Sequence, residues 1–282
     1  MSVFELAKDA WARGSADNIS LLAAGVAFYA FLAFVPLLAA VVLTYGLFAD
    51  PEDAVRQAET VAGVLPRAAT ELVIEQMQDV AGSDPRGNAL GLVVAIGTAI
   101  FGALRGAKSV IIALNIAEHV DQPRGFIGQT GMALSITLSL ILVIAIGLVA
   151  IGATSSIPKL IPGFPEDLLP VVRTALWILF AVAAIFAHAF IYRYAPNRDV
   201  CSLKDVLPGA VVATILLLAV TFGFAAYVSS FGSYNATYGA LGAVVILLFW
   251  LYLSTMALLL GAELNEAVRC ADGAAARRSE AC

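Results

Sequence analysis

Ionisable side chains inside apolar stretches are the residues of this sequence that could do chemistry. Arg105 and Lys108 interrupt one such stretch, His188 lies inside another, and Glu263 ends a third together with Asn265. Ionisable groups in membrane-spanning segments usually face other helices or a water-filled cavity, and they mark ligand sites. These five residues are therefore the predicted substrate-binding residues.

Arg105 and Lys108 are three residues apart and share one face of a helix. Gly102 and Gly106 bracket Arg105 and would let another helix approach closely. Two interpretations stay open: the cations extend into headgroup water, or they form a site for an anionic lipid headgroup. A carboxylate at the depth of Glu263 needs a cation, so we expect it to pair with Arg105 or Lys108.

His188 and Pro36 each allow two interpretations. A histidine between two alanines of an apolar stretch is either a ligand-binding group or a neutral, hydrogen-bonded packing residue. Pro36 lacks a backbone N–H and should bend the first long apolar stretch. That bend is either a packing kink or a hinge.

Sequence motifs for catalysis are missing. His119 and His188 have no metal-type spacing to cysteines or acids, and no Gly-x-Ser-x-Gly, phosphate loop or His-Glu-x-x-His occurs. Lys and Arg form no cluster that would attract nucleic acid. We therefore predict no enzyme activity, no catalytic residue, no metal or other cofactor, and no nucleic-acid partner.

The elements that must position these residues are transmembrane helices. Of 282 residues, 61% are hydrophobic and 13% are charged, far from the balance of a soluble domain. Six apolar stretches are long enough to cross a bilayer as helices. They are Ile19–Phe48, Ala89–Ala117, Phe126–Ile157, Val171–Ala195, Val206–Phe231 and Tyr238–Glu263. The predicted fold class is an all-α membrane protein with a bundle of six transmembrane helices.

The segments outside this bundle have their own patterns. Residues 1–17 are amphipathic and predict a helix in the membrane interface. Residues 18–268 form the predicted transmembrane domain, whose outer loop 50–88 mixes acidic and apolar residues and predicts amphipathic helices. Residues 269–282 are the predicted cytoplasmic tail.

The distribution of Lys and Arg predicts the orientation. With six spans, both termini share a side, which holds 11 Lys and Arg residues against 5 on the opposite side. Both termini are therefore predicted to be cytoplasmic. The three cysteines fall on that side, where thiols stay reduced, and no structural disulfide is expected.

Several segments resemble the YihY/BrkB family of bacterial inner-membrane proteins. They are NISLLAAGVAFYAFLAFVPLL at 18–38, Leu114-Asn115, Tyr194-Ala195-Pro196-Asn197-Arg198, and the final span from Tyr238-Gly239-Ala240-Leu241 to Gly261-Ala262-Glu263-Leu264-Asn265. The resemblance implies six helices and an inner-membrane location. Members have been labelled ribonuclease BN, or linked to virulence, serum resistance or movement of envelope lipids. RNA hydrolysis would need a metal cluster or an acid/base pair, which these residues do not offer.

Two function classes follow from the sequence. The first is a transporter or flippase-like protein for an amphipathic or anionic envelope substrate, with Pro36 as a hinge. The second is a non-transporting scaffold or envelope-integrity factor, whose outer loop contacts envelope partners. Membrane lipids, including an anionic headgroup, are the expected partners, and a homo-oligomer is compatible with the sequence.

Overall fold

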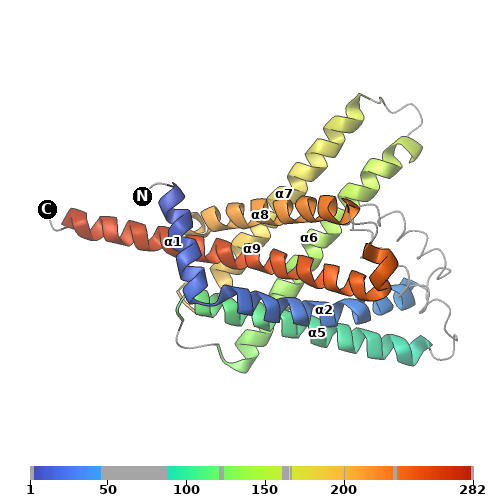
Figure 1. Cartoon of the computed structure of the whole chain (residues 1–282), viewed down its shortest axis with the longest axis horizontal. Helices are drawn as coiled ribbons and strands as arrows, with labels where there is room; N and C mark the ends of the chain where they lie inside the picture. The colour runs from blue at the N-terminus through green and yellow to red at the C-terminus, as the bar shows by residue number, and fades with distance from the viewer. Residues whose placement is uncertain are drawn as a thin grey trace. The chain divides into compact units, whose positions relative to one another are not determined.

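The described part of the chain is helical. The computed structural model describes residues 3–45, 88–120, 124–160, 165, 167–199, 201–230 and 234–280, and no strand occurs among them. The helices are α1 (Val3–Ala16), α2 (Ile19–Tyr45), α5 (Asn88–Ala117), α6 (Phe126–Leu160), α7 (Leu168–Tyr194), α8 (Leu203–Ser230) and α9 (Tyr234–Glu280) (Figure 1). The predicted amphipathic helices of the outer loop lie outside the described residues.

The predicted six-helix membrane fold is confirmed. Each of the six apolar stretches coincides with one long helix, from α2 to α9. Among the described residues, five helices are long and apolar enough to cross a membrane, and the count is six if α1 and α2, which meet at a bend of 70°, are taken as one span. The last helix runs past the predicted end of the bundle at residue 268 and continues to Glu280.

Hydroxyl groups inside these apolar helices are satisfied by the helices themselves. Thr137, Thr174 and Ser254 donate to the carbonyl oxygens four residues earlier, at 2.8–2.9 Å. An unsatisfied hydroxyl would be costly in lipid, and this local bond removes the cost without a partner helix.

The chain divides into two compact units. Unit 1 comprises Met1–Ala23, Val110–Leu217 and Met256–Cys282, and unit 2 comprises Ala24–Ser109 and Leu218–Thr255. Four of the long helices, α2, α5, α8 and α9, therefore contribute a part to each unit.

Unit 2 is built on close packing of α2 against α5. A side chain on Gly102 would lie 2.8 Å from the Cα of Ala33, and one on Gly106 would lie 3.7 Å from the backbone of Ala30. The predicted role of Gly102 and Gly106, to admit another helix, is confirmed, and α2 is that helix. Leu247 of α9 is buried in the same unit.

Unit 1 contains α6 and α7 side by side, and most of the polar contacts described below (Figure 1). A Cβ on Gly147 would meet the ring of Phe180 at 3.0 Å, so the two helices touch closely there. Leu114, Tyr192 and Leu259, from α5, α7 and α9, are completely buried. The start of α1 and the end of α9 lie at the same end of the unit (Figure 1).

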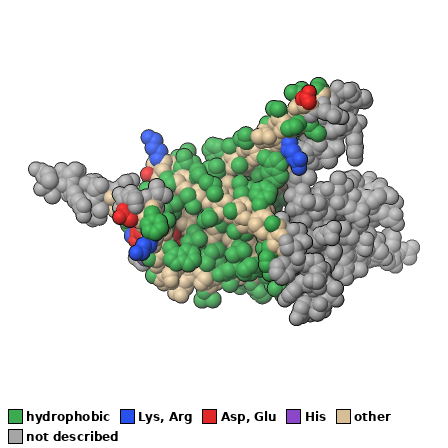
Figure 2. All heavy atoms as spheres, turned by 45° about the horizontal axis from the view of Figure 1, so that its top comes forward, with side chains coloured by type: hydrophobic (Ala, Val, Ile, Leu, Met, Phe, Trp, Pro, Cys, Tyr) green, Lys and Arg blue, Asp and Glu red, His purple; other side chains and the backbone are tan. Residues whose placement is uncertain are grey.

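The surface is largely apolar, as expected of a protein that contacts lipid. Hydrophobic side chains cover most of the described surface on the face in Figure 2. In unit 1, Leu138, Leu142, Val171 and Ile215 expose more than half of their area. Soluble proteins rarely expose apolar side chains this densely, so acyl chains are their natural neighbours.

Candidate functional site

The centre of the site is a close crossing of α8 and α9. A Cβ on Gly209 would overlap the carbonyl oxygen of Gly261, and a Cβ on Gly261 would lie 2.7 Å from the carbonyl oxygen of Gly209. Only glycine lets the two backbones approach this far. Asn265 then links them, because its Oδ1 accepts from the N–H of Gly209 at 2.7 Å and its Nδ2 donates to Val206 O at 3.2 Å.

These contacts give Asn265 a packing role. Its side chain is completely buried, and both the oxygen and the nitrogen of its amide group form hydrogen bonds with α8. Tyr192 of α7 joins the same crossing, since its hydroxyl donates to Leu258 O at 2.6 Å. The substrate-binding role of Asn265 stays a prediction.

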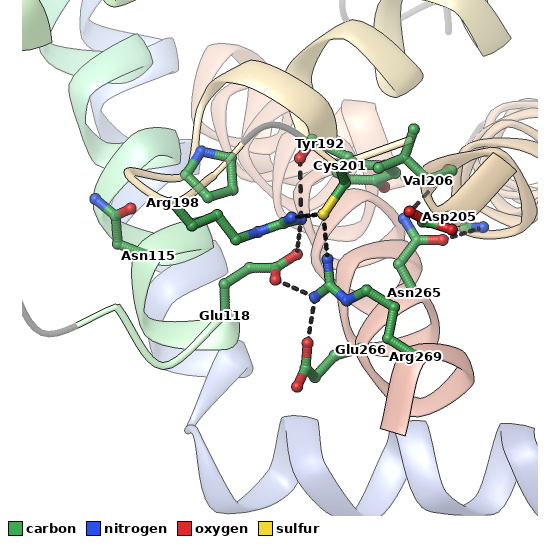
Figure 3. Close-up of polar contacts among 12 residues, drawn as sticks. Asn115, Glu118, Tyr192, Arg198, Cys201, Asp205, Val206, Asn265, Glu266 and Arg269 are labelled. Carbon is green, nitrogen blue, oxygen red and sulfur yellow. Dashed lines mark hydrogen bonds and ion pairs between the residues drawn. The ribbon is translucent and has the colours of Figure 1, made fainter. Parts of the chain in front are cut away.

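An ionic network links the segments at one end of unit 1. Arg198, which follows α7, donates to Glu118 Oε1 at 2.9 Å, and Arg269 of α9 donates to the other oxygen of Glu118 and to Glu266 (Figure 3). The Glu118 side chain is 2% exposed, so it depends on these two cations. The sulfur of Cys201 lies between them, accepting from Arg198 and, at 3.3 Å, from Arg269.

The segment after α7 is held by backbone contacts as well. Arg124 donates to the carbonyl oxygens of Tyr194, Ala195 and Pro196 at 2.6–3.1 Å. The segment is also fixed from α5, where Asn115 Oδ1 accepts from the N–H of Asn197 at 2.9 Å. The Leu114-Asn115 and Tyr194–Arg198 motifs are therefore parts of one structural contact.

These contacts show which connections share an end of unit 1. The joint of α1 and α2, the end of α5, the start of α6, the segment after α7 and the C-terminal part of α9 are all tied to one another. His119 Nε2, for example, lies 3.9 Å from Asp17 Oδ1. The orientation predicted from the Lys and Arg distribution places these same segments on one side.

Both carboxyl oxygens of Glu263 are buried and have no hydrogen-bond partner among the described residues. Its pairing with Arg105 or Lys108, which belong to unit 2, stays a prediction. The end of α1 covers Glu263, because a Cβ on Gly14 would lie 3.5 Å from the Cγ of Glu263. The sequence could not reveal this, since α1 bends back at a joint whose Asn18 has a φ of 54°.

His188 is a hydrogen-bonded packing residue in this structure. Its Nδ1 lies 2.9 Å from Ala184 O and 3.1 Å from Thr214 Oγ1. Because Ala184 O only accepts, and the Thr214 hydroxyl donates to Ala210 O at 2.8 Å, we assign the proton to Nδ1. These contacts fit the second of its two interpretations, and its role in substrate binding stays a prediction.

Arg105, Lys108 and Pro36 belong to unit 2. The exposed Arg105 stacks on the ring of Phe101, one turn earlier in α5, with 5.1 Å between Cζ of Arg105 and the ring centre. Pro36 lies within α2, where it is half-buried. The anionic-headgroup site and the hinge stay predictions.

An apolar groove lies between α1, α8 and α9 in unit 1. Its volume is about 590 Å³. Leu6 of α1, Leu207 and Val211 of α8, and Leu264 of α9 are among its lining residues, and Lys204 is the one charged residue among the described residues that line it. The groove can therefore accept an apolar chain beside a single positive charge.

Sequence reasoning missed the ionic network and part of the helix crossing. Glu118 and Gly209 were not singled out, and Arg198 was noted only as part of the Tyr194–Arg198 motif. One signal was available, because Gly209 and Gly261 are glycines inside apolar stretches, where close helix contacts favour small residues. The pairing of Glu118 with Arg269 carries no such signal.

The helices and their apolar surface define this protein as a multi-pass membrane protein of the α-helical class. Residues 10–281 match the family described as "Virulence factor BrkB", so the chain belongs to that family. No solved structure matches the chain.

Named relatives match most or part of the chain. It is 29% identical to a UPF0761 membrane protein of Alteromonas mediterranea over 88% of this chain and 82% of that protein. It is 33% identical to the ribonuclease-like protein YfkH of Bacillus subtilis, over 59% of this chain and 62% of that protein. A UPF0761 membrane protein of Halorhodospira halophila is 29% identical over 90% of this chain, which covers 54% of that protein.

Proposed function

We propose that this protein is a transporter or flippase-like protein that moves an anionic, amphipathic lipid of the bacterial envelope. The observation that carries the proposal is the apolar groove between α1, α8 and α9 with Lys204 on its lining. An acyl chain gains free energy along the apolar wall, and a phosphate or carboxylate headgroup gains it beside the ammonium group.

The position of Lys204 supports an anionic headgroup. Lys204 is the second residue of α8, and its side chain is exposed. The free N–H groups at a helix N-terminus favour negative charge, so the helix and the lysine act in the same direction. Asp205, the next residue, accepts a hydrogen bond from the N–H of Ser202 at 3.0 Å, which holds its carboxylate at the helix start.

The ribonuclease-like name of YfkH does not guide our proposal for this chain. RNA hydrolysis commonly uses a metal cluster, and the part of the chain that the structure describes contains no group of three His, Cys, Asp or Glu side chains able to hold a metal ion. We therefore propose that the protein is not an enzyme, and that its polar residues serve helix packing and lipid movement.

The proposed orientation puts both termini and Lys204 on the cytoplasmic side of the inner membrane. It rests on the 11 to 5 division of Lys and Arg residues. The contacts that tie the connections at one end of unit 1 support it, because they place these segments together. The groove would then take its lipid from the cytoplasmic leaflet.

Filling the groove tests this function. In proteoliposomes with a fluorescent phosphatidylglycerol, dithionite quenches outer-leaflet lipid, and slow further quenching measures lipid movement. We expect Val211→Trp to reduce the rate toward that of protein-free liposomes, since the indole occupies the space that the acyl chain needs. The matched control is Ile215→Trp, one turn further along α8 at an exposed position. Equal rates for the two variants, both folded, would contradict transport through this groove.

A further inference from the structure

The carboxyl group of Glu263 is buried beneath the joint of α1 and α2 with no hydrogen-bond partner. Glu263 is 0% exposed, and neither of its carboxyl oxygens accepts a hydrogen bond from any described residue. It also lies within a membrane-spanning segment, Val244–Ala271. An ionised carboxylate in this position would lose its hydration without compensation, at a cost that proteins normally avoid.

Asp17 is the other half of this feature. Asp17 follows Gly14 by three residues at the end of α1, and a Cβ on Gly14 would lie 3.5 Å from the Cγ of Glu263. The Oδ2 of Asp17 is likewise buried and has no hydrogen-bond partner among the described residues. Two ionised carboxylates repel each other because both are negatively charged. They also form no hydrogen bond with each other, since each can only accept one. One proton changes this, because the neutral carboxyl group can donate to its neighbour.

The ionisable side chains on α1 and at the end of α5 do not neutralise the charges of Glu263 and Asp17. Arg13 is next to Gly14 on α1, but its Nε donates to Asp9 at 3.0 Å and forms an ion pair there. His119, whose side chain is 63% exposed, lies 3.9 Å from Asp17 Oδ1. It therefore connects Asp17 with water and does not reach Glu263 through any described bond.

The ionic network holds further charges at this end of unit 1. Glu118 binds Arg198 and Arg269, and Arg269 also binds Glu266 on the next turn of α9. The two cations and two acids balance in this network. It therefore offers Glu263 no spare positive charge of its own.

We propose that Glu263 and Asp17 form a proton-binding site, in which one proton is held between the two carboxyl groups. The O–H of Glu263 donates to an oxygen of Asp17, which stays ionised. On release, the proton passes from Glu263 to Asp17 and on to His119 or water, and Glu263 becomes a carboxylate.

The bound proton would stabilise the contact between α1 and α9. Loss of the proton leaves two negative charges between these helices, and their repulsion favours separation. Since Leu6 of α1 also lines the groove, protonation would act on a wall of that groove. The proton site is nevertheless independent of lipid transport, because proton binding can be measured without it.

Dicyclohexylcarbodiimide tests the site, because it modifies protonated carboxyl groups in apolar surroundings. We expect peptide mass spectrometry of the full-length protein in detergent to find Glu263 modified at neutral pH and less so at alkaline pH. Glu266, three residues along the same helix and paired with Arg269, is the internal control and should stay unmodified. In Asp17→Asn, which removes the neighbouring negative charge, modification should fall off at a lower pH.

Infrared spectroscopy gives a second readout that does not depend on access of the reagent. The parent at neutral pH should show the carbonyl band of a protonated carboxyl group, and Glu263→Gln should lack it. Equal modification of Glu263 and Glu266, or identical infrared spectra in this region for parent and Glu263→Gln, would overturn the proposal. Either result would leave lipid movement through the groove untouched.

Discussion

Glu118→Ala is expected to lower the free energy of unfolding by about 3–5 kcal/mol, the usual cost of removing one partner of a buried ion pair. The Glu118 side chain is 2% exposed, while those of Arg198 and Arg269 are 17% and 21% exposed. Without Glu118, the guanidinium groups of Arg198 and Arg269 stay largely buried. They lose the carboxylate whose negative charge offsets the free-energy cost of burying them. Unfolding in mixed micelles of mild detergent and dodecyl sulfate measures the change.

The control for this variant is Asp167→Ala. Asp167 precedes α7, is exposed, and its side chain makes no capping hydrogen bond, so its loss should cost less than about 0.5 kcal/mol. The double variant Glu118→Ala/Arg269→Ala should be less destabilised than the sum of the single variants, since the charges compensate each other. Additive effects, or a Glu118→Ala cost no larger than that of Asp167→Ala, would show that the network contributes little.

Gly209→Ala should destabilise the protein by at least the roughly 1–3 kcal/mol that overpacking of a well-packed core costs. The new methyl group would collide with the carbonyl oxygen of Gly261 and lie 2.5 Å from the amide of Asn265. Relief requires moving α8 away from α9, which also breaks the hydrogen bond between Gly209 and Asn265. The free energy of unfolding in mixed micelles measures this cost.

Gly223→Ala is the matched control on the same helix. A Cβ at Gly223 would have no atom of the described residues within 4 Å, so the substitution should be neutral or stabilise α8 by up to about 1 kcal/mol through helix propensity. If Gly209→Ala and Gly223→Ala change stability equally, the close crossing of α8 and α9 is not a feature of the folded protein.

The sequence predicts the membrane helices well because their ends carry clear signals. The predicted start of the first span at Ile19 and the predicted end of the second at Ala117 coincide with the limits of α2 and α5. In both cases an apolar run meets polar residues, and the cost of burying those residues in lipid fixes the boundary. The end of α9 was missed, because residues beyond 268 are polar yet remain helical outside the apolar run.

The site was less predictable, because pairing of side chains depends on how helices meet. Glu263 was recognised as a buried acid, but its neighbour proved to be α1, which the sequence places in the interface with no indicated contact. Arg269 was counted only as a charge that sets orientation, although it holds two acids together. Residue type and hydropathy indicate depth in the membrane, and they carry no information on such partners.

The most direct test of the proposed function compares two lipids in one preparation. Proteoliposomes of the parent protein carry fluorescent phosphatidylglycerol or fluorescent phosphatidylcholine, and dithionite quenching gives the rate of movement of each. The groove with its single Lys204 predicts faster movement of the anionic lipid, and Lys204→Glu should remove that preference. Rates for both lipids equal to those of protein-free liposomes would contradict the account.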